Sequence, residues 1–416
     1  LLVGGGERSS HRNELDQDVL EISDNFSLPI GTAHRLTIGT QNQFYDVRNL
    51  FQQQGFGRWI FGSLDSLELG APRQFAVGVP VSGDGAVRFN ARQHAFYVQD
   101  EWTVSPTFNL AAGLRMDMPV FGDKPPQNPL IANPVCAGTG QPSATCGFAR
   151  NTSEVPSGNI QWSPRIGFNW DVTGNQKNQL RGGLGLFTGR PAYVWLANAF
   201  QNSGLSGVAQ LTCNNAAAPR ITTGNITAPP SACANGTTAA AGAEINLLDK
   251  DLKFPQNMRA TLGYDRQLMG GFVGTLEAMY TKGVNNLFYQ NIALAGPQGV
   301  DYKGRVMYGP NVNAPVLKVT GRTAVLDVQN QSKDYSYSLT AGLARRWRNN
   351  FEGSLFYTYS DARDVQSLTS STANSQYQFG RPVATRQDDP TLGYSVFRQP
   401  HRLVGQFSYA FKTKTD

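Results

Sequence analysis

The sequence lacks several features that would assign it to a common class of protein. No run of 18 apolar residues occurs in its 416 residues, so no membrane-spanning helix is expected. Charged residues make up only 16%, and the net charge of +6 is spread along the chain without a block of Lys and Arg. A nucleic-acid partner is therefore not expected, because nucleic-acid-binding surfaces gather basic residues in one segment or on one face.

Motifs for metal binding and catalysis are also missing. The four histidines have no partner three or four residues away, and no HExxH or CxxC motif occurs, so no metal site is expected. No G-x-S-x-G nucleophile motif is present. The segment GGLGLFTGR at 182–190 lacks the G-K-[ST] ending of a phosphate-binding loop, and we interpret it as small residues on a strand. The sequence predicts neither an enzyme nor a bound cofactor.

Cysteine is scarce, and its four occurrences form two local pairs, Cys136 with Cys146 and Cys213 with Cys233. Both pairs lie in stretches rich in Gly, Pro, Ala and Thr, without a neighbouring histidine. Zinc sites usually have CxxC spacing and histidine partners. We therefore interpret the pairs as two loop disulfides formed in an oxidising compartment. Four unpaired thiols in a reducing cytosol are the alternative.

The sequence does contain strand alternation, which is most regular in residues 88–118. Read at period two, Leu110 and Leu114 fall on one face of the segment, whereas Arg115 falls on the other. Such alternation is typical of a strand with different environments on its two sides. Pro106 interrupts the pattern where a tight turn is needed. The segment therefore predicts a long antiparallel hairpin with one apolar and one polar face.

The same pattern recurs, with short turns and long connections in alternation. Strands are expected at 15–28, 34–48, 88–104, 107–118, 164–172, 180–187, 258–268, 272–282, 335–346, 351–360 and 401–411, and long loops without secondary structure at 119–159, 188–254, 283–333 and 361–394. A compact soluble domain rarely contains four such loops. Outer-membrane barrels have short periplasmic turns and long extracellular loops, and their strands are apolar at every second position. The prediction is an all-β fold, an antiparallel transmembrane β-barrel.

Three tryptophans support a membrane boundary near the short turns. Trp102, Trp170 and Trp347 each lie just before such a turn. Aromatic residues form girdles at the lipid–water interfaces of outer-membrane barrels. The alternative is ordinary core packing in a soluble β-sandwich.

Three segments resemble a known family. AFYVQDEWTVSPTFNLAAGLRMD (95–117) resembles the Y-x-Q-D-x-W…L-x-x-G-L-R hairpin of TonB-dependent outer-membrane receptors. SPRIGFNWDVTGNQKNQLRGGLGLFTGR (163–190) resembles the next hairpin of the Oar-like branch, in which a carboxypeptidase-regulatory-like domain precedes the plug. HRLVGQFSYAF (401–411) resembles a late barrel strand. The resemblance implies a 22-stranded barrel in the cell outer membrane, occupied by a plug and energised through TonB.

The chain also departs from that family pattern. It has no recognisable plug, about eleven long strands, and the ending KTKTD in place of a terminal aromatic residue. Residues 1–416 are therefore expected to be a fragment, part of a receptor barrel domain without the plug and the C-terminal strands. Its expected partners are outer-membrane lipid, TonB through the missing plug, and a surface lipoprotein.

The function that follows is uptake of a scarce ligand, an iron chelate, a peptide or protein, or a glycan. No ligand-binding residue is predicted, and capture is assigned to the long loops. Polar residues of the alternating strands are expected to face the lumen as its lining: Arg115, Arg165, Asn169, Arg181 and Glu277. The alternatives are a passive outer-membrane porin or surface adhesin, and a soluble secreted carbohydrate-binding protein.

Overall fold

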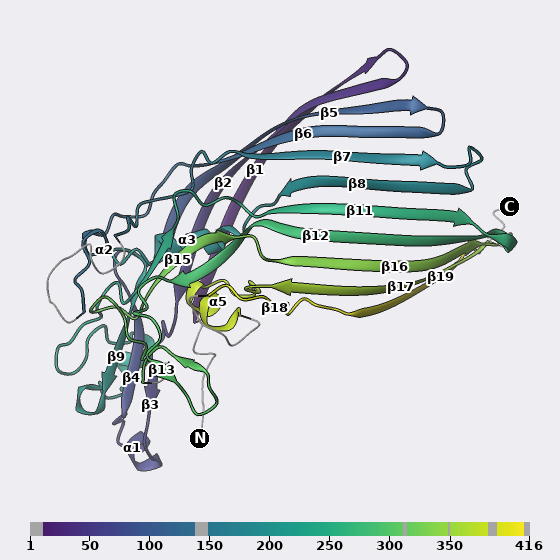
Figure 1. Ribbon diagram of the computed structural model, residues 1–416. Coiled ribbons are helices and arrows are strands. Elements are labelled where there is room, and N and C mark those ends of the chain that lie inside the picture. The colour runs from purple at the N-terminus through teal and green to yellow at the C-terminus, as the bar shows by residue number, and fades with distance from the viewer. Residues whose placement is uncertain (1–10, 138–148, 311–313, 348–349, 382–388, 412–416) are drawn as a thin grey trace, which may run out of the picture.

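The structure is a computed structural model that describes residues 11–137, 149–310, 314–347, 350–381 and 389–411. Its main feature is a curved sheet of 14 strands, shown in Figure 1. Eleven long strands of this sheet are antiparallel neighbours in chain order: β1 (Arg12–Ile30), β2 (His34–Gln52), β5 (Val87–Ser105), β6 (Phe108–Phe121), β7 (Gln161–Asp171), β8 (Asn178–Thr188), β11 (Gln256–Gln267), β12 (Phe272–Asn291), β16 (Tyr335–Arg346), β17 (Phe351–Asp364) and β19 (His401–Tyr409). The all-β antiparallel prediction is confirmed. None of the helices in the described ranges is long and apolar enough to cross a membrane.

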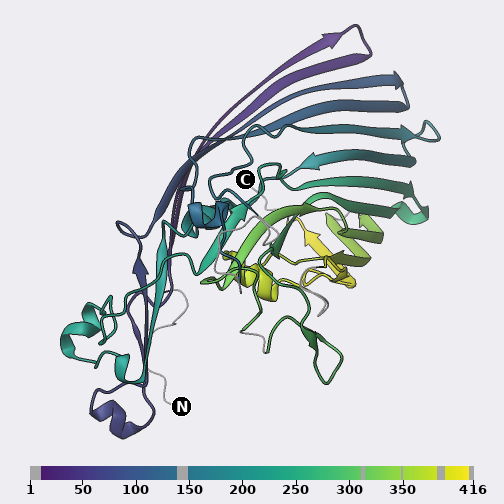
Figure 2. The same ribbon diagram turned by 60° about the vertical axis from the view of Figure 1, so that its left-hand side comes forward.

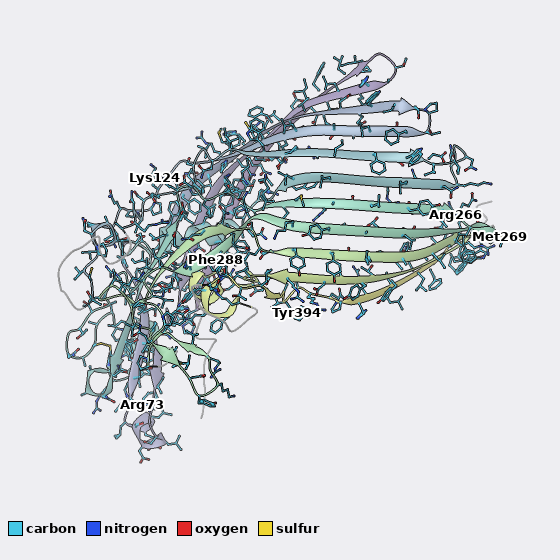
Figure 3. All side chains as sticks on the ribbon, viewed as in Figure 1. Arg73, Lys124, Arg266, Met269, Phe288 and Tyr394 are labelled. Carbon is cyan, nitrogen blue, oxygen red and sulfur yellow. A yellow bond between two sulfur atoms is a disulfide. The ribbon has the colours of Figure 1, made fainter. Side chains whose placement is uncertain are left out.

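The short and long connections lie at opposite ends of the strands, as the sequence predicts. Met269, in the β11–β12 turn, lies at the turn end, whereas Lys124 and Arg73 lie among the long connections at the loop end (Figure 3). The turns use residues that tolerate a left-handed backbone. Gly270 and Gly271 have φ of 73° and 75° in the β11–β12 turn, a conformation that side chains with a Cβ rarely adopt.

One face of the sheet carries a continuous apolar surface. Ile38 of β2 pairs with Val98 of β5, which pairs with Leu114 of β6, so the three side chains lie on the same face. Leu114 keeps 40% of its surface exposed, and Leu339 of β16 keeps 54%. These strands are therefore not packed as two stacked sheets, because in a sandwich the apolar faces would be buried against each other.

The long connections contain secondary structure, so the expectation of unstructured loops is wrong. The described elements there are β3 (Arg58–Ile60), α1 (Leu64–Glu68), β4 (Gln74–Pro80), α2 (Pro129–Ala132), α3 (Tyr193–Gln201), β9 (Val208–Asn214), α4 (Thr223–Thr227), β10 (Glu244–Leu248), β13 (Gly299–Val300), β14 (Val306–Met307), β15 (Ala324–Gln331), α5 (Ala373–Phe379) and β18 (Gly393–Tyr394). Most of these strands form because segments far apart in the chain pair with each other. β4 pairs with β9, and β10 pairs in parallel with β15.

The buried core lies at the loop end. Helix α3 packs on the sheet through its aromatic residues, with ring centroids 4.4 Å apart for Tyr45 and Tyr193 and 4.3 Å apart for Phe89 and Phe200. Leu196 of α3 and Leu326 of β15 are fully buried in the same cluster, which we call the loop core. The loop end is thus held together by an ordinary hydrophobic core.

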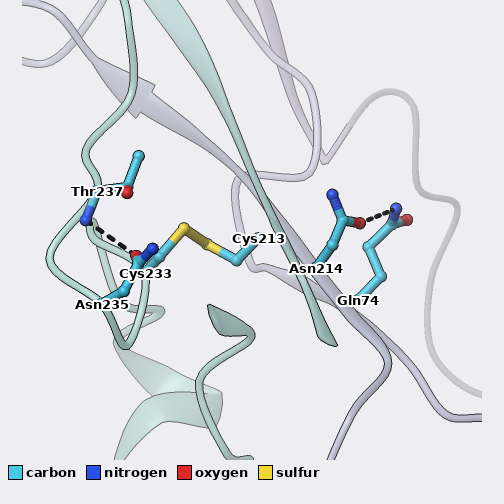
Figure 4. The surroundings of a disulfide bond; sticks show 6 residues. All are labelled: Gln74, Cys213, Asn214, Cys233, Asn235 and Thr237. Carbon is cyan, nitrogen blue, oxygen red and sulfur yellow. Dashed lines mark hydrogen bonds between the residues drawn. A yellow bond between two sulfur atoms is a disulfide. The ribbon is translucent and has the colours of Figure 1, made fainter. Parts of the chain in front are cut away.

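Strands β3, β4 and β9 form a second small sheet that projects away from the main sheet (Figure 2). A disulfide joins Cys213 of β9 to Cys233, and Gln74 donates a hydrogen bond of 2.9 Å to Asn214 beside it (Figure 4). Of the other predicted pair, Cys146 lies outside the described residues, and its pairing with Cys136 stays a prediction.

Candidate functional site: the polar face of the sheet

All five residues predicted to face a lumen lie on one face of the sheet. Asn169 is paired with Arg181, and Arg181 is connected through Gly263 to Glu277. Nearer the loop end, Arg115 of β6 is paired with Ser163 of β7, and Arg165 follows Ser163 by two residues on the same strand. Directly opposed residues of antiparallel strands point to the same side, as do residues two apart on one strand. We call this side, opposite to the apolar face, the polar face.

An ion-paired cluster surrounds Arg181 toward the turn end of the polar face. Its Nη2 lies 2.9 Å from Oε2 of Glu277, and its Nη1 forms an ion pair with Asp265. The Asp265 carboxylate also accepts a hydrogen bond of 2.6 Å from Thr275. Gly263 leaves room for the guanidinium, since a Cβ there would lie 2.9 Å from its Cζ. Sequence reasoning missed Asp265, although its spacing of two from Gly263 placed it on this face.

A second cluster surrounds Arg115 nearer the loop end. Its Nη2 lies 2.9 Å from Oδ1 of Asp117, which is only 1% exposed, and its Nε donates to the same carboxylate at 3.0 Å. The guanidinium also donates to Gln41 at 3.0 Å and lies 5.7 Å from the ring centroid of Tyr97. Because the buried Asp117 is fully engaged by Arg115, the pair contributes fixed structure to the wall.

Hydrogen bonds extend this second cluster to the edge of the sheet. Glu21 of β1 accepts from the amides of Gln41, at 2.8 Å, and Gln43. The Tyr45 hydroxyl donates to Gln43 at 2.8 Å, and Arg190, which follows β8, donates to Tyr45 at 2.8 Å. Glu21, Gln41 and Gln43 carried the alternation signal that could have identified them, whereas Arg190 lies outside any strand and had none.

Two hollows of the polar face border the predicted residues. One of about 560 Å³ lies beside Asn169, Arg181 and Glu277. The other, of about 340 Å³, lies near the loop end and is lined by Arg115 and Arg165. Three of the five predicted residues, Arg115, Arg181 and Glu277, belong to the two clusters, and all five border a hollow.

The predicted tryptophans lie at the turn end. Trp102 pairs across the sheet with Leu110, on the apolar face, and stacks on His34 at 5.3 Å. Trp170 pairs with Phe108 on the same face. Trp347 contacts Phe351 with a centroid distance of 4.9 Å. The three rings are half-exposed and lie at the turn end of the strands. This favours the predicted aromatic girdle over a soluble core, in which the rings would be buried.

Buried carboxylates at the loop end lie away from the polar face clusters. Burial raises the pKa of Glu244, at the start of β10, to about 7. Burial also raises the pKa of Asp327, whose carboxylate lies 2.6 Å from Arg150. Both act on the stability of the loop core.

The apolar face, the polar face and the segregated turns together define an outer-membrane β-barrel wall. The chain belongs to the outer membrane beta barrel domain family, whose model matches residues 3–415. The protein is accordingly located in the cell outer membrane, which excludes the soluble secreted alternative. None of the curated proteins matches the chain.

Several solved structures are similar to this chain, and the first of them supports the fold. The outer membrane transporter YddB from Escherichia coli aligns with 95% of this chain and 41% of its own, at 12% identity and a TM-score of 0.50. A mutant of the ferric enterobactin receptor PfeA from Pseudomonas aeruginosa aligns with 85% of this chain over 36% of its own length, at 14% identity and a TM-score of 0.45. The FrpB iron transporter from Neisseria meningitidis aligns with 84% of this chain over 37% of its own length, at 11% identity and a TM-score of 0.44. This chain thus spans 36–41% of the length of these structures.

Proposed function

We propose that the protein is the barrel part of a TonB-dependent receptor of the Oar-like branch, which takes up a scarce ligand across the outer membrane. Two observations support this proposal. The segments that resemble the family, 95–117 and 163–190, form the adjacent hairpins β5–β6 and β7–β8 of one sheet. The likeness to an outer-membrane transporter supports the fold that such a receptor needs.

In this proposal the apolar face contacts lipid and the polar face lines the lumen. A sheet can span lipid only when every backbone group is paired, which requires closure into a barrel. Within the described residues, the outer edges of β1 and β19 have no strand partner. These unpaired edges support the proposal that the eleven long strands are one part of a wider closed barrel, for which the resemblance implies 22 strands and a plug.

The position of the loop core is the observation that favours a receptor over a passive porin. Tyr45 and Phe89, on which α3 packs, lie on the same face as Gln43 and Gln93, which is the polar face. Folded loops therefore cover the loop end of the proposed lumen. A narrowed entrance suits selective capture, whereas a passive porin keeps an aqueous channel open. An iron chelate, a peptide or protein, or a glycan all remain compatible ligands.

The proposal is tested by the conductance of the full-length gene product in planar lipid bilayers. We expect no steady open channels, because loops and plug close the lumen. Steady channels that pass small ions without energy would favour the porin alternative. In a second assay the same protein should bind the isolated periplasmic domain of TonB, and failure to bind would contradict the TonB-dependent part alone.

The predicted surface lipoprotein partner stays a proposal. The sheet of β3, β4 and β9 reaches away from the barrel wall (Figure 2), and we assign such a partner to this surface.

A further inference from the structure

The hollow beside Arg115 and Arg165 has an unusual lining. Three arginines line this cavity of about 340 Å³, Arg115, Arg165 and Arg190. The remaining polar lining comes from Gln41, Gln43, Gln93, Ser163 and Thr188, and its described lining contains no Asp or Glu. The cavity therefore presents cationic and neutral donors to whatever enters it.

The three arginines are not equally neutralised. Arg115 is held by the buried Asp117 at 2.9 Å. Arg190 donates to the neutral hydroxyl of Tyr45 at 2.8 Å, and it forms no ion pair among the described residues, although the carboxylate of Glu21 interacts with its charge from outside the lining. Arg165 has no ion pair or hydrogen bond from its guanidinium among the described residues, and its buried Nε has no partner there. The cavity thus keeps a positive charge and a buried donor that lacks an acceptor.

Glycines lie opposite Arg165 on both neighbouring strands. Arg165 is paired with Gly113 of β6 and Gly185 of β8. A Cβ at Gly113 would lie 3.5 Å from Nε of Arg165, and a Cβ at Gly185 would lie 2.9 Å from its Cβ. The two residues directly opposite Arg165 therefore have no side chain that could pair with the guanidinium. Leaving a buried donor without an acceptor costs free energy that a bound acceptor would recover.

We propose that this cavity binds the oxyanion group of a small organic anion, with Arg165 and Arg190 as its cationic ligands. A guanidinium presents paired N–H donors that match the two oxygens of a carboxylate or a phosphate. A volume of about 340 Å³ lies within the range of small-molecule sites. The ring of Phe187, which is 44% exposed and lines the cavity, offers an apolar contact to the rest of the ligand.

The inference rests on the proposed function in one respect, since the cavity must stay open to solute beside the proposed plug, but it does not require coupling to TonB. It is tested by equilibrium dialysis of the purified full-length protein in detergent, with citrate, inorganic phosphate and uncharged glucose as probes. We expect citrate or phosphate to bind and glucose not to bind. Tighter binding of citrate identifies a carboxylate ligand, and tighter binding of phosphate identifies a phosphorylated one.

Variants separate this cavity from the general charge of the wall. Arg165→Gln should weaken binding of the oxyanion at least tenfold, and Arg190→Gln about fivefold. Arg165→Lys, which keeps the charge without the paired donors, should lose less than Arg165→Gln. The matched control is Arg259→Gln, because Arg259 is also paired with Gly185 on the polar face but does not line the cavity. It should change affinity less than twofold.

The outcomes decide the inference in either case. A wild-type protein that binds neither citrate nor phosphate overturns it. Equal losses in Arg165→Gln and Arg259→Gln also overturn it, because they would mean unspecific attraction to a basic surface. Each variant is first shown to be assembled by its heat-dependent mobility on a gel. If Arg165→Gln fails to assemble, Arg165→Lys and Arg190→Gln carry the same comparison. Failure of TonB binding leaves these results unaffected, so the two proposals fail separately.

Discussion

The two ends of the same strands are stabilised by different interactions. At the turn end the hairpins are held by backbone pairing and by polar-face clusters such as Arg181 with Asp265 and Glu277, while Leu114 and Leu339 stay exposed on the apolar face. At the loop end Leu196 and Leu326 are fully buried in the loop core. The turn end thus depends on lipid to cover its apolar side chains, whereas the loop end carries a core of its own.

This difference implies that the two regions can be destabilised separately. The loop core gains its free energy from apolar burial in water, as a soluble domain does. The wall gains most of its free energy from paired backbone groups in a medium without water, where breaking one pair is costly. Substitutions at the two ends should therefore have effects that stay local.

The largest expected effect is on the loop core. Phe200→Ala removes a buried ring that stacks on Phe89 at 4.3 Å, and truncation of a buried phenylalanine costs about 3–5 kcal/mol. Hydrogen exchange measured by mass spectrometry should accelerate in α3 and β10 while β7 and β8 stay protected. Phe96→Ala, on the apolar face, is the control and should leave α3 unchanged. Equal acceleration along β7 would show that the two ends unfold as one unit.

A second prediction tests which face contacts lipid. Leu339→Arg places a charge on the apolar face in the middle of β16, where such a residue costs about 2–4 kcal/mol in outer-membrane barrels. Thr340→Arg, one residue later, places the same charge on the polar face and should cost clearly less, because lumen-facing substitutions alter selectivity and leave the lipid contact unchanged. Urea unfolding from lipid vesicles measures both. Equal costs would contradict the assignment of the two faces.

The wall was predictable from sequence, and most of the loop end was not. The hairpin at 88–118 is recognisable in the sequence because its apolar side chains, which contact lipid, recur at every second position. Its register is set by the local turn. The pairs β4 with β9 and β10 with β15 join segments more than 70 residues apart, as Phe75 opposite Cys213 shows. No local pattern encodes such a pairing. Helix α3 is short and buried on several sides, so it has little amphipathic signal.

The candidate site divides in the same way. Arg115 and Arg181 stand out as charges in alternating strands, and their partners Asp117 and Asp265 had the same signal. The proposed anion cavity also needs Arg190, which comes from the connection after β8 and is placed by tertiary structure alone. Strand residues of the site follow from the local pattern, and residues supplied by the loops do not.

The smallest expected effect concerns pH and again only the loop end. Burial raises the pKa of Glu244 to about 7 from its model-peptide value near 4.5. Between these values the folded chain holds a proton that the unfolded chain has lost, so stability falls as pH rises from about 4.5 to about 7 and then levels off. The full difference corresponds to about 3 kcal/mol at most. Asp327 adds a contribution of the same sign.

Glu244→Gln isolates the contribution of this side chain, because Asp327 is common to both proteins. Hydrogen exchange of β10, corrected for intrinsic rates, should depend less on pH between 5 and 8 in the variant than in the parent. Glu68→Gln, in the exposed helix α1, is the control and should behave like the parent. An unchanged pH dependence in Glu244→Gln would assign the effect to Asp327. If hydrogen exchange in β7 and β8 depended on pH to the same extent, the stability of the wall would be coupled to that of the loop core. This result would contradict the view that the two ends are stabilised separately.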